Sequence, residues 1–428
     1  MDTDTSEALF RRAVDLLPGG VNSPVRAMRA IGREHPIFVE RGEGCDLVDV
    51  DGNRYIDWVC SWGPLILGHA DPGVLEAVQA AAARGTSFGA PTEGEVELAA
   101  EVCDRFDSVE MLRMVSSGTE AAMSAVRLAR AATEREKLIK FAGAYHGHVD
   151  GLLAEGGSGL ATQGIPASPG VPASQAAATI VVAWNEIDAV RSALEAHEIA
   201  AVLAEPLPAN MGLVPPRDGF LAELRELATE HGALLVLDEV ISGFRVARGG
   251  AQELYGAEAD ITVLGKVIGG GLPAAAYGGS RELMQRVAPA GDVYQAGTLS
   301  GNPLAVAAGR ATLARLDSTA YERLGELSER LATGLRAAAG DRRVSVVSAP
   351  GLVTPFFSPE PPRDFAAATA CDLDAYGRFA RALLDRGVYP PASQFEAWFV
   401  SLAHDEAAID RTCDAAAEAF AASEGSDG

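Results

Sequence analysis

Short apolar runs alternate with amphipathic stretches through the middle of the chain, from about Tyr55 to Asn302. Several of these runs are solidly apolar rather than alternating, which is typical of strands that are covered on both faces. Helical patterns at 121–133 and 219–231 lie between them. We therefore predict an α/β domain in which a mostly parallel central sheet lies between two helical layers, a three-layer sandwich. The predicted strands are 112–115, 138–141, 179–183, 200–203, 233–237 and 261–264.

The two ends of the chain follow different patterns from the middle. A helical pattern at 6–17 precedes two strand-like pieces at 37–40 and 45–50. The C-terminal part carries long helical patterns and few strands, which favours a smaller α+β domain. Its helices are expected at 304–316, 321–339, 374–386 and 406–422. We predict three parts: an N-terminal segment (1–55), a large domain (56–302) and a small C-terminal domain (303–428).

A segment rich in Gly, Ser, Pro and Ala interrupts the predicted large domain at 155–175, EGGSGLATQGIPASPGVPASQ. Loops of this length are uncommon within compact domains, and they are usually active-site lids or disordered inserts. We expect this segment to be one of the two.

The charge balance narrows the classes of partner. The chain has 35 Lys and Arg against 59 Asp and Glu, a net charge of −24. A field of that sign repels nucleic acid and anionic lipid, so neither is an expected partner. The five cysteines are scattered without a CxxC pair, which favours reduced thiols over a disulfide framework or a zinc site. The N-terminus lacks a signal-peptide pattern and no apolar run reaches ~18 residues, so we expect a cytoplasmic protein.

A lysine lies between an apolar strand and a run of glycines at 259–274, ADITVLGKVIGGGLPA. Gly265 and the three glycines at 269–271 leave the backbone around Lys266 open to close approach. A solvated lysine at a strand end is the alternative, since lysines are seldom buried. A partly desolvated lysine at this turn would have a lowered pKa and could form a Schiff base.

An aspartate ends the preceding apolar strand in the segment 233–245, ALLVLDEVISGFR. Open α/β sheets bind ligands at the carboxyl ends of their strands, where Asp238 is expected. Taken alone, Asp238 favours a helix N-cap or a strand-end salt bridge. With Lys266 at the end of the next strand, its carboxylate could instead keep a pyridine nitrogen protonated.

Small polar residues link a strand to a helix in the segment 114–121, MVSSGTEA. Ser117, Gly118 and Thr119 would present hydroxyl and backbone N–H groups at a helix N-terminus, which is a ready anion site. Ordinary capping, with Glu120 in the first turn, uses the same geometry. This segment alone does not separate the two.

An aromatic residue and two histidines follow another strand at 141–148, FAGAYHGH. Tyr145 and His146 could stack on a flat ring or form hydrogen bonds beside it. The pair His146 and His148 suggests a metal, but no carboxylate or cysteine pattern completes such a site, so no metal is expected.

A loop at 294–303, YQAGTLSGNP, places Thr298 and Ser300 among glycines, where they could contact phosphate. An ordinary turn into the next helix is the alternative. Each of these five segments is a modest signal, but each lies beside a predicted element boundary, and together they favour one cofactor site.

Nine segments together resemble the glutamate-1-semialdehyde 2,1-aminomutases, a family within the class III aminotransferase group of fold-type I pyridoxal-phosphate enzymes. The resemblance covers nearly the whole chain. Its most specific parts are VNSPVR, the 155–175 segment and SQFE, which class III enzymes in general do not share. The chain departs from the usual family pattern at 351–357 and 390–392. The segments are PGGVNSPVRA, SWGPLILGHA, SSGTEA, AYHGH, SGLATQGIPASPGVP, LDEVISGFR, LGKVIGGGLP, GTLSGNPLA and SQFEAWFVSLAH.

The resemblance implies the fold of the fold-type I pyridoxal-phosphate enzymes. It also implies a pyridoxal 5'-phosphate cofactor that alternates with pyridoxamine 5'-phosphate. Lys266 would form the Schiff base and shuttle protons, and Asp238 would pair with the pyridine nitrogen. The other implied cofactor contacts are Ser117, Gly118, Thr119, Tyr145, His146, Glu205, Asn210 and Thr298, the last reaching across from the partner subunit of a homodimer. The implied substrate contacts are Ser23, Arg26, Trp62, Ser158 and Glu396.

The activity that the resemblance implies is an isomerisation in tetrapyrrole (porphyrin) biosynthesis. Glutamate 1-semialdehyde, which is (S)-4-amino-5-oxopentanoate, would become 5-aminolevulinate through 4,5-diaminovalerate. An ω-aminotransferase of the same fold with a separate amino donor is the alternative, and VNSPVR and SQFE argue against it. A non-catalytic regulator is disfavoured because Lys266 is present and no basic segment appears. Contact with the upstream glutamyl-tRNA reductase is a further hypothesis.

Overall fold

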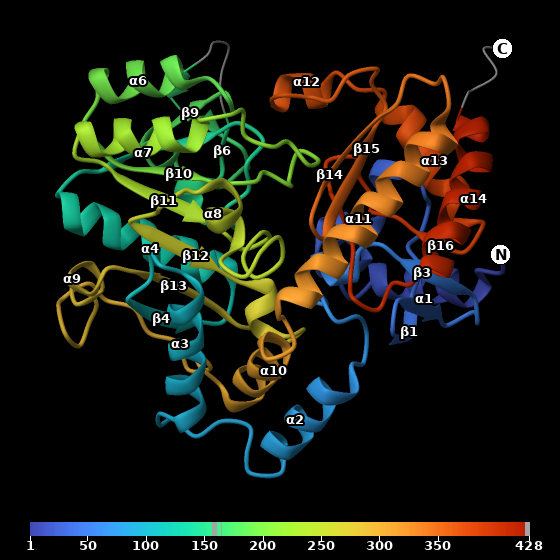
Figure 1. The fold of residues 1–428 in the computed structure, drawn as a ribbon, viewed down its shortest axis with the longest axis horizontal. Helices are drawn as coiled ribbons and strands as arrows, with labels where there is room; N and C mark the ends of the chain where they lie inside the picture. Colours follow the sequence, from blue (N-terminus) through green and yellow to red (C-terminus); the bar gives the residue numbers. More distant parts are fainter. Residues whose placement is uncertain (156–160, 164, 424–428) are drawn as a thin grey trace.

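A computed structural model describes residues 1–155, 161–163 and 165–423 of the 428-residue chain. Its largest element is an eight-stranded sheet in the order β4-β13-β12-β11-β10-β5-β9-β7, on the left of Figure 1. The strands are β4 Met111–Val115, β5 Lys137–Phe141, β7 Ala161–Gln163, β9 Thr179–Val182, β10 Ile199–Ala204, β11 Leu234–Asp238, β12 Ile261–Leu264 and β13 Ala275–Gly279.

Six strands of this sheet run parallel, and all six were predicted from apolar runs. β9, β5, β10, β11 and β12 pair in parallel. β13 is antiparallel to both β12 and β4, so β4 points the same way as the other five. The prediction of a mostly parallel sheet is confirmed. The sequence AAYGG of β13 was not predicted as a strand because its small residues form no bulky apolar run.

Helices cover both faces of the sheet. Helix α4 (Gly118–Thr133) packs on one face, in a cluster with Val236 and Ile261. Helices α6 (Ile187–Ala196) and α7 (Phe220–Glu230) pack on the other, with Leu235 and Leu237. Neighbouring residues of β11 thus enter opposite cores, which explains why its sequence is apolar from Leu234 to Leu237. The three-layer prediction is confirmed.

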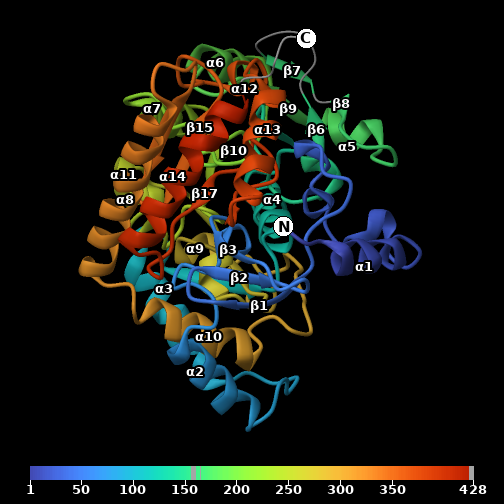
Figure 2. The same cartoon turned by 90° about the vertical axis from the view of Figure 1, so that its right-hand side faces the viewer.

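The N-terminal residues share a sheet with the C-terminal part of the chain. β16 (Val388–Tyr389) extends the sheet of β1 (Val39–Glu43), β2 (Asp46–Asp49) and β3 (Arg54–Asp57) by pairing in parallel with β3. Figure 2 shows these strands beside the C-terminal helices, with α1 (Asp4–Val14) at the side. The limits 55/56 and 302/303 of the three predicted parts stay a prediction.

The C-terminal part combines helices with a small antiparallel sheet. The four predicted helices are present as α10 (Pro303–Leu313), α11 (Ser318–Ala339), α13 (Leu373–Leu384) and α14 (Glu406–Ser423). The sheet contains β14 (Ser345–Ala349), β15 (Leu352–Phe356) and β17 (Trp398–Phe399). The remaining named elements are α2 Pro72–Ala82, α3 Glu93–Arg105, α5 Ala173–Ala177, α8 Gly250–Tyr255, α9 Arg281–Met284 and α12 Phe365–Thr369.

The segment 155–175, predicted as a lid or a disordered insert, contains regular elements in its described part. β6 (Ala154–Glu155) pairs with β8 (Ile165–Pro166), and β7 adds an antiparallel edge to the large sheet. Residues 156–160 and 164 lie outside the described part, so the lid prediction stays a prediction.

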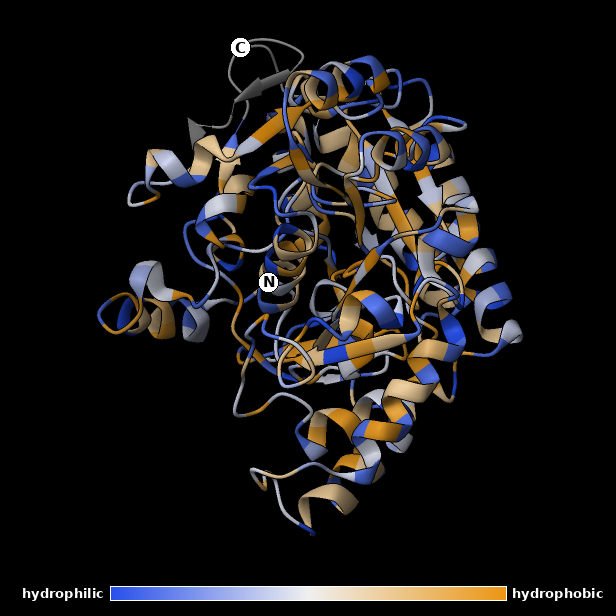
Figure 3. Ribbon diagram, turned by 90° about the vertical axis from the view of Figure 1, so that its left-hand side faces the viewer, coloured by the Kyte–Doolittle hydropathy of each residue, from blue (hydrophilic) through white to orange (hydrophobic). Residues whose placement is uncertain are grey.

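Apolar residues concentrate along the inner strands, whereas the outer helices mix apolar and polar faces (Figure 3). This is the expected arrangement for strands buried between two layers of amphipathic helices. None of the helices within the described ranges is both long enough and apolar enough to cross a membrane.

Candidate active site

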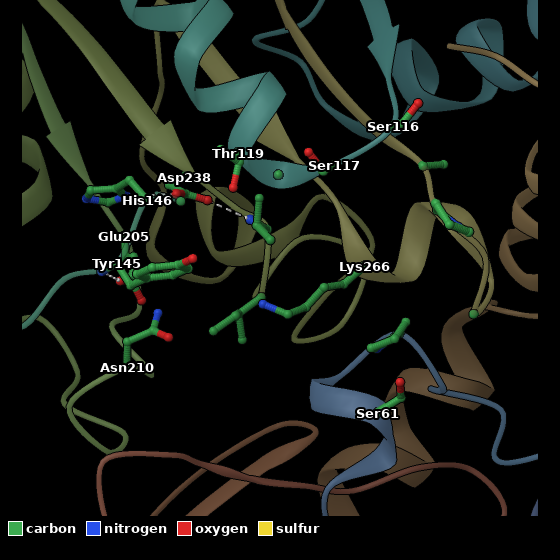
Figure 4. A pocket seen from close by; sticks show the side chains of 18 of the residues that line it. Ser61, Ser116, Ser117, Thr119, Tyr145, His146, Glu205, Asn210, Asp238 and Lys266 are labelled. Atoms are coloured by element: carbon green, nitrogen blue, oxygen red, sulfur yellow. Dashed lines mark hydrogen bonds and ion pairs between the residues drawn. The ribbon is translucent and has the colours of Figure 1, made fainter. Parts of the chain in front are cut away.

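A pocket of about 490 Å³ opens where the parallel strands β4, β5, β10, β11 and β12 end. Because these strands point the same way, the residues that follow them meet at one edge of the sheet. Figure 4 shows them around a single space, with Lys266 between the Asp238 side and Ser61. Ten predicted site residues line it: Arg26, Ser117, Gly118, Thr119, Tyr145, His146, Glu205, Asn210, Asp238 and Lys266.

The start of α4 forms the anion-binding end of the pocket. Ser117 caps the helix by accepting from the Glu120 N–H at 3.2 Å, and Glu120 accepts from the Ser116 N–H at 2.8 Å. The capping interpretation of Ser117 is therefore correct, but it leaves the pocket-lining Gly118 and Thr119 at the first helical positions. N–H groups at these positions have no acceptor within their own helix. A Cβ on Gly118 would lie 3.2 Å from Val240, so glycine keeps this approach open.

Asp238 and His146 form a buried pair behind the pocket. Their exposed fractions are 5% and 2%, and His146 Nδ1 lies 2.7 Å from Asp238 Oδ2. The Val240 N–H donates to the other carboxylate oxygen at 3.0 Å. Among the described residues His146 Nε2 has no hydrogen-bond partner. The arrangement holds the carboxylate at the pocket edge, where it can face a cationic ring nitrogen.

Glu205 holds the backbone of two loops together. Its carboxylate accepts from the Tyr145 N–H at 2.9 Å and from the Ala209 N–H at 3.1 Å. Burial raises the pKa of this carboxyl group. Both loops thereby bring Tyr145 and Asn210 to the same side of the pocket (Figure 4). The Tyr145 ring is half exposed, so a flat ligand ring can stack on it.

Lys266 lies in the left-handed region of backbone conformation, with φ of 50°. Such a conformation is uncommon for a residue with a side chain and is often found at functional sites. Burial lowers the pKa of its amine and the charge of Arg245 lowers it further, while Asp238, Glu396 and Glu205 raise it. The lysine is therefore desolvated rather than solvated, which favours a neutral, nucleophilic amine.

Of the described residues that were predicted to contact the substrate, Arg26 lines the pocket and the others do not. Arg26 is exposed and lines the pocket. Ser23 precedes the 3-10 turn Pro24–Ala27 that carries Arg26, and Trp62 ends the 3-10 turn Cys60–Trp62, next to the pocket-lining Ser61. Burial raises the pKa of Glu396 to about 7. Among the described residues, the lining of this pocket does not include Ser23, Trp62, Glu396 or Thr298.

Two further predicted contacts fall away from the pocket or cannot be described. Thr298 is exposed, on the loop before α10. Ser158 lies outside the described residues. Among the described pocket-lining residues, two with polar side chains were missed, Ser61 and Ser116. Ser61 lies within a quoted motif, but nothing in its local pattern indicates which way a turn points its side chain.

The residues present fit pyridoxal 5'-phosphate. The start of α4 offers N–H groups for a phosphate, and Asp238 offers a buried carboxylate for a protonated pyridine nitrogen. Lys266 offers a desolvated amine and Tyr145 a half-exposed ring. Among the described residues, no group of three or more His, Cys, Asp or Glu side chains is arranged to hold a metal ion.

Comparison with known proteins agrees with this geometry. Residues 28–415 match the family model "Aminotransferase class-III". A protein from Roseiflexus castenholzii named glutamate-1-semialdehyde 2,1-aminomutase is 58% identical over 425 residues, which are 98% of each chain.

Solved structures place two activities on this fold. An omega-transaminase from Sphaerobacter thermophilus superposes with a TM-score of 0.92 at 32% identity, covering 98% of each chain. A glutamate-1-semialdehyde-aminomutase from Pseudomonas aeruginosa gives 0.89 at 28% identity, covering 98% of this chain and 94% of the other. Similarity to these two structures does not separate the two activities, but the 58% full-length identity to the Roseiflexus castenholzii protein does. The chain belongs to the class III aminotransferase family and, within it, to the glutamate-1-semialdehyde 2,1-aminomutases.

Proposed function

We propose that this protein converts glutamate 1-semialdehyde into 5-aminolevulinate by moving an amino group within one molecule, through 4,5-diaminovalerate. This reaction would supply tetrapyrrole biosynthesis. One observation carries the proposal. The desolvated Lys266 lines the same pocket as the buried carboxylate of Asp238, in a chain that is 58% identical, over 98% of its length, to a protein of that name.

Pyridoxal 5'-phosphate, when bound and alternating with its pyridoxamine form, supplies the electron sink for the amino transfer. The chain's own residues hold and orient it. Gly118 and Thr119 would hold the phosphate with backbone N–H groups, with Ser117 beside them. Asp238, kept in place by His146 and the Val240 N–H, would keep the pyridine nitrogen protonated.

Lys266 would take a proton from, or return one to, the substrate carbon whose amino group is exchanged, as the 1,3-prototropic shift of each half-reaction requires. A base in this role must be neutral at working pH, and burial together with the Arg245 charge lowers its pKa in that direction. Glu396 acts on the same amine electrostatically. With a pKa of about 7, Glu396 can change its protonation state near neutral pH and accept a proton from a substrate ammonium group.

The substrate carboxylate would be bound at the pocket mouth by Arg26, with Ser23 one turn before it and Trp62 on the opposite wall. A guanidinium matches a carboxylate with two parallel hydrogen bonds. The contact proposed for Ser158 stays a prediction, since that residue lies outside the described part of the chain.

We propose further that the protein is a homodimer in which Thr298 of the partner subunit completes the phosphate site. In a single chain Thr298 is exposed and does not line the pocket. Its neighbours Tyr294 and Leu299 are 71% and 51% exposed, an apolar surface that a second copy would cover. A cytoplasmic location and contact with glutamyl-tRNA reductase also stay predictions.

The decisive experiment supplies the purified, cofactor-loaded protein with glutamate 1-semialdehyde and no amino donor. We expect 5-aminolevulinate to form, and we expect Lys266→Ala to form none above background. If the protein made 5-aminolevulinate only with an added donor, or not at all, the proposal would be wrong.

An ω-aminotransferase is the second candidate, and the backbone match to the Sphaerobacter thermophilus enzyme favours it. The same assay separates the two. An ω-aminotransferase would transfer nitrogen from an added amine to an oxo acid and release the deaminated donor, whereas the proposed reaction needs no added amine and releases no deaminated donor.

A further inference from the structure

The wall opposite Asp238 is a strained turn at residues 60–63. Four consecutive residues have positive φ: Cys60 at 47°, Ser61 at 59°, Trp62 at 66° and Gly63 at 111°. Three of them carry side chains, and each such residue costs roughly 1 kcal/mol or more unless its surroundings impose the conformation. The turn therefore needs strong external contacts.

Asp57 holds the start of this turn. Its carboxylate accepts from the Val59 N–H at 2.8 Å and from the Cys60 N–H at 3.1 Å. His69 Nε2 lies 2.6 Å from the same carboxylate. These contacts fix where the turn begins, but they do not reach its last residue.

Arg245 holds the end of the turn. The side chain is fully buried and donates to the carbonyl oxygens of Gly63, Gly351 (3.2 Å) and Val400 (2.9 Å). Its guanidinium lies 5.1 Å from the centre of the Phe399 ring. Among the described residues it has no carboxylate within ion-pair distance. A buried cation without a counter-ion is costly, and the three carbonyl oxygens are the hydrogen-bond partners that offset this cost.

The turn that Arg245 holds lies beside the reactive lysine. A methyl group placed on Gly63 would lie 3.3 Å from Lys266 Cδ and 2.8 Å from Phe399 Cε1. The backbone of Gly63 is thus one wall of the space occupied by the lysine stem. Any displacement of the turn would change the room available to the amine.

We propose that Arg245 is a positioning residue, which holds the 60–63 turn against the Lys266 side chain through the Gly63 carbonyl and so fixes where the reacting amine lies. This inference rests on the proposed role of Lys266. Burial is the main cause of the lowered pKa of that amine, and the fixed charge of Arg245 acts in the same sense, by less than Asp238, Glu396 or Glu205 raises it. Among the described residues that line the pocket, Arg245 is not included.

The test compares Arg245→Lys and Arg245→Met with a matched pair at Arg135. Arg135 also ties backbone carbonyls together, those of Ile199 (3.0 Å), His231 (2.8 Å) and Gly232 (2.9 Å), but it lies away from the pocket. Lysine keeps the charge and loses the planar fork, whereas methionine loses both. Gly63→Ala disturbs the same contact without altering Arg245. Its control is Gly232→Ala, at another glycine with positive φ (65°), whose carbonyl accepts from Arg135.

Three measurements are made on each variant. Amide hydrogen exchange reports on residues 59–63. Acetic anhydride labelling of cofactor-free protein across pH, read on the Lys266 peptide by mass spectrometry, reports the protonation of the amine. Steady-state kinetics separates kcat from KM. The first two need no activity, so they test the placement of Lys266 even if the proposed reaction is wrong.

We expect Arg245→Lys and Gly63→Ala to speed exchange at the turn about tenfold and to lower kcat about 10²-fold, the cost of misplacing a reacting group by about 1 Å. Arg245→Met should also move the labelling midpoint of Lys266 to higher pH, which Arg245→Lys should not. If the Arg245 variants match the Arg135 variants in exchange, labelling and kcat, the proposal is wrong. If Arg245→Met does not fold, Arg245→Lys and Gly63→Ala decide alone.

Discussion

The two walls of the pocket are built in different ways. The strand-end wall (residues 116–119, His146 and Asp238) follows the ends of parallel strands, and its backbone is relaxed, as at Ser117 with φ of −148° and ψ of 156°. The turn wall (residues 60–63) has positive φ throughout. One wall is a direct product of the sheet, and the other is held by buried side chains from residues 57 and 245.

This difference indicates where function can change without loss of the fold. The strand-end wall is fixed many times over, because β5 and β11 are each paired on both sides, β4 pairs with β13 along its whole length, and helices cover the sheet. The turn wall depends on few contacts, so single substitutions should alter its geometry while the sheet stays intact. The predictions below test this contrast, beginning with the largest expected effect.

Lys266→Ala removes the group that lies between the two walls. We expect the rate of 5-aminolevulinate formation to fall by about 10⁴-fold, since both nucleophile and proton carrier are lost. The melting temperature should not fall, because the variant also removes a desolvated amine. Residual activity above about a tenth of wild type would exclude Lys266 from the chemistry.

Asp238→Asn changes the charge of the strand-end wall and little of its shape. We expect kcat to fall about 10²-fold or more, because the amide cannot stabilise a protonated pyridine nitrogen. Asp260→Asn is the control: this aspartate accepts from the Leu235 N–H at 2.8 Å and pairs with Arg225, just before β12. Equal losses of kcat in the two variants would contradict the role of Asp238.

The strand-end wall could be predicted from sequence, and its hydrogen bonds could not. Lys266 and Asp238 were identified because each follows an apolar run and because parallel strands end at one edge. The pairing of His146 with Asp238 joins the ends of β5 and β11, which have β10 between them. That contact requires the order of strands in the sheet, which local patterns do not contain.

The turn wall could not be predicted from local patterns at all. Positive φ at Cys60, Ser61 and Trp62 contradicts the usual preference of such residues, and it is imposed by contacts from distant parts of the chain. A buried Arg245 likewise contradicts the usual exposure of arginine. Family resemblance drew attention to Trp62 and Glu396, but it did not indicate how the turn is held.

Low pH should reduce the free energy of unfolding through His404, which lies close to the start of the turn wall. His404 stacks on Trp58, and its Nε2 lies 3.1 Å from the Asp57 carbonyl oxygen. Burial lowers the pKa of His404 to about 4, below the unfolded value of 6.5. Between these values the unfolded chain binds more protons, so this contribution to stability is lost as pH falls from 6.5 to 4, by at most about 3 kcal/mol.

The measurement is the free energy of unfolding of wild type and His404→Gln at several pH values. Glu396 opposes the trend, because its pKa is raised to about 7 and its protonation favours the folded state as pH falls. Both proteins contain Glu396, so its contribution cancels when the free energy of unfolding of His404→Gln is subtracted from that of wild type. We expect wild type to lose stability relative to His404→Gln below pH 6.5; a constant difference would contradict the buried neutral histidine.

The smallest effect comes from relieving backbone strain in the turn wall itself. Ser61→Gly should raise the free energy of unfolding by roughly 0.5 kcal/mol, because glycine adopts φ of 59° without a side-chain penalty. Glu134→Gly is the matched control, at φ of 56° in the C-cap of α4 and away from the pocket. We expect both variants to gain stability in chemical denaturation, but only Ser61→Gly to lose kcat/KM, because a relaxed turn no longer holds its place against Lys266. If Ser61→Gly gained stability at full activity, the strain would be unconnected with function; if it lost stability, the turn would not be strained.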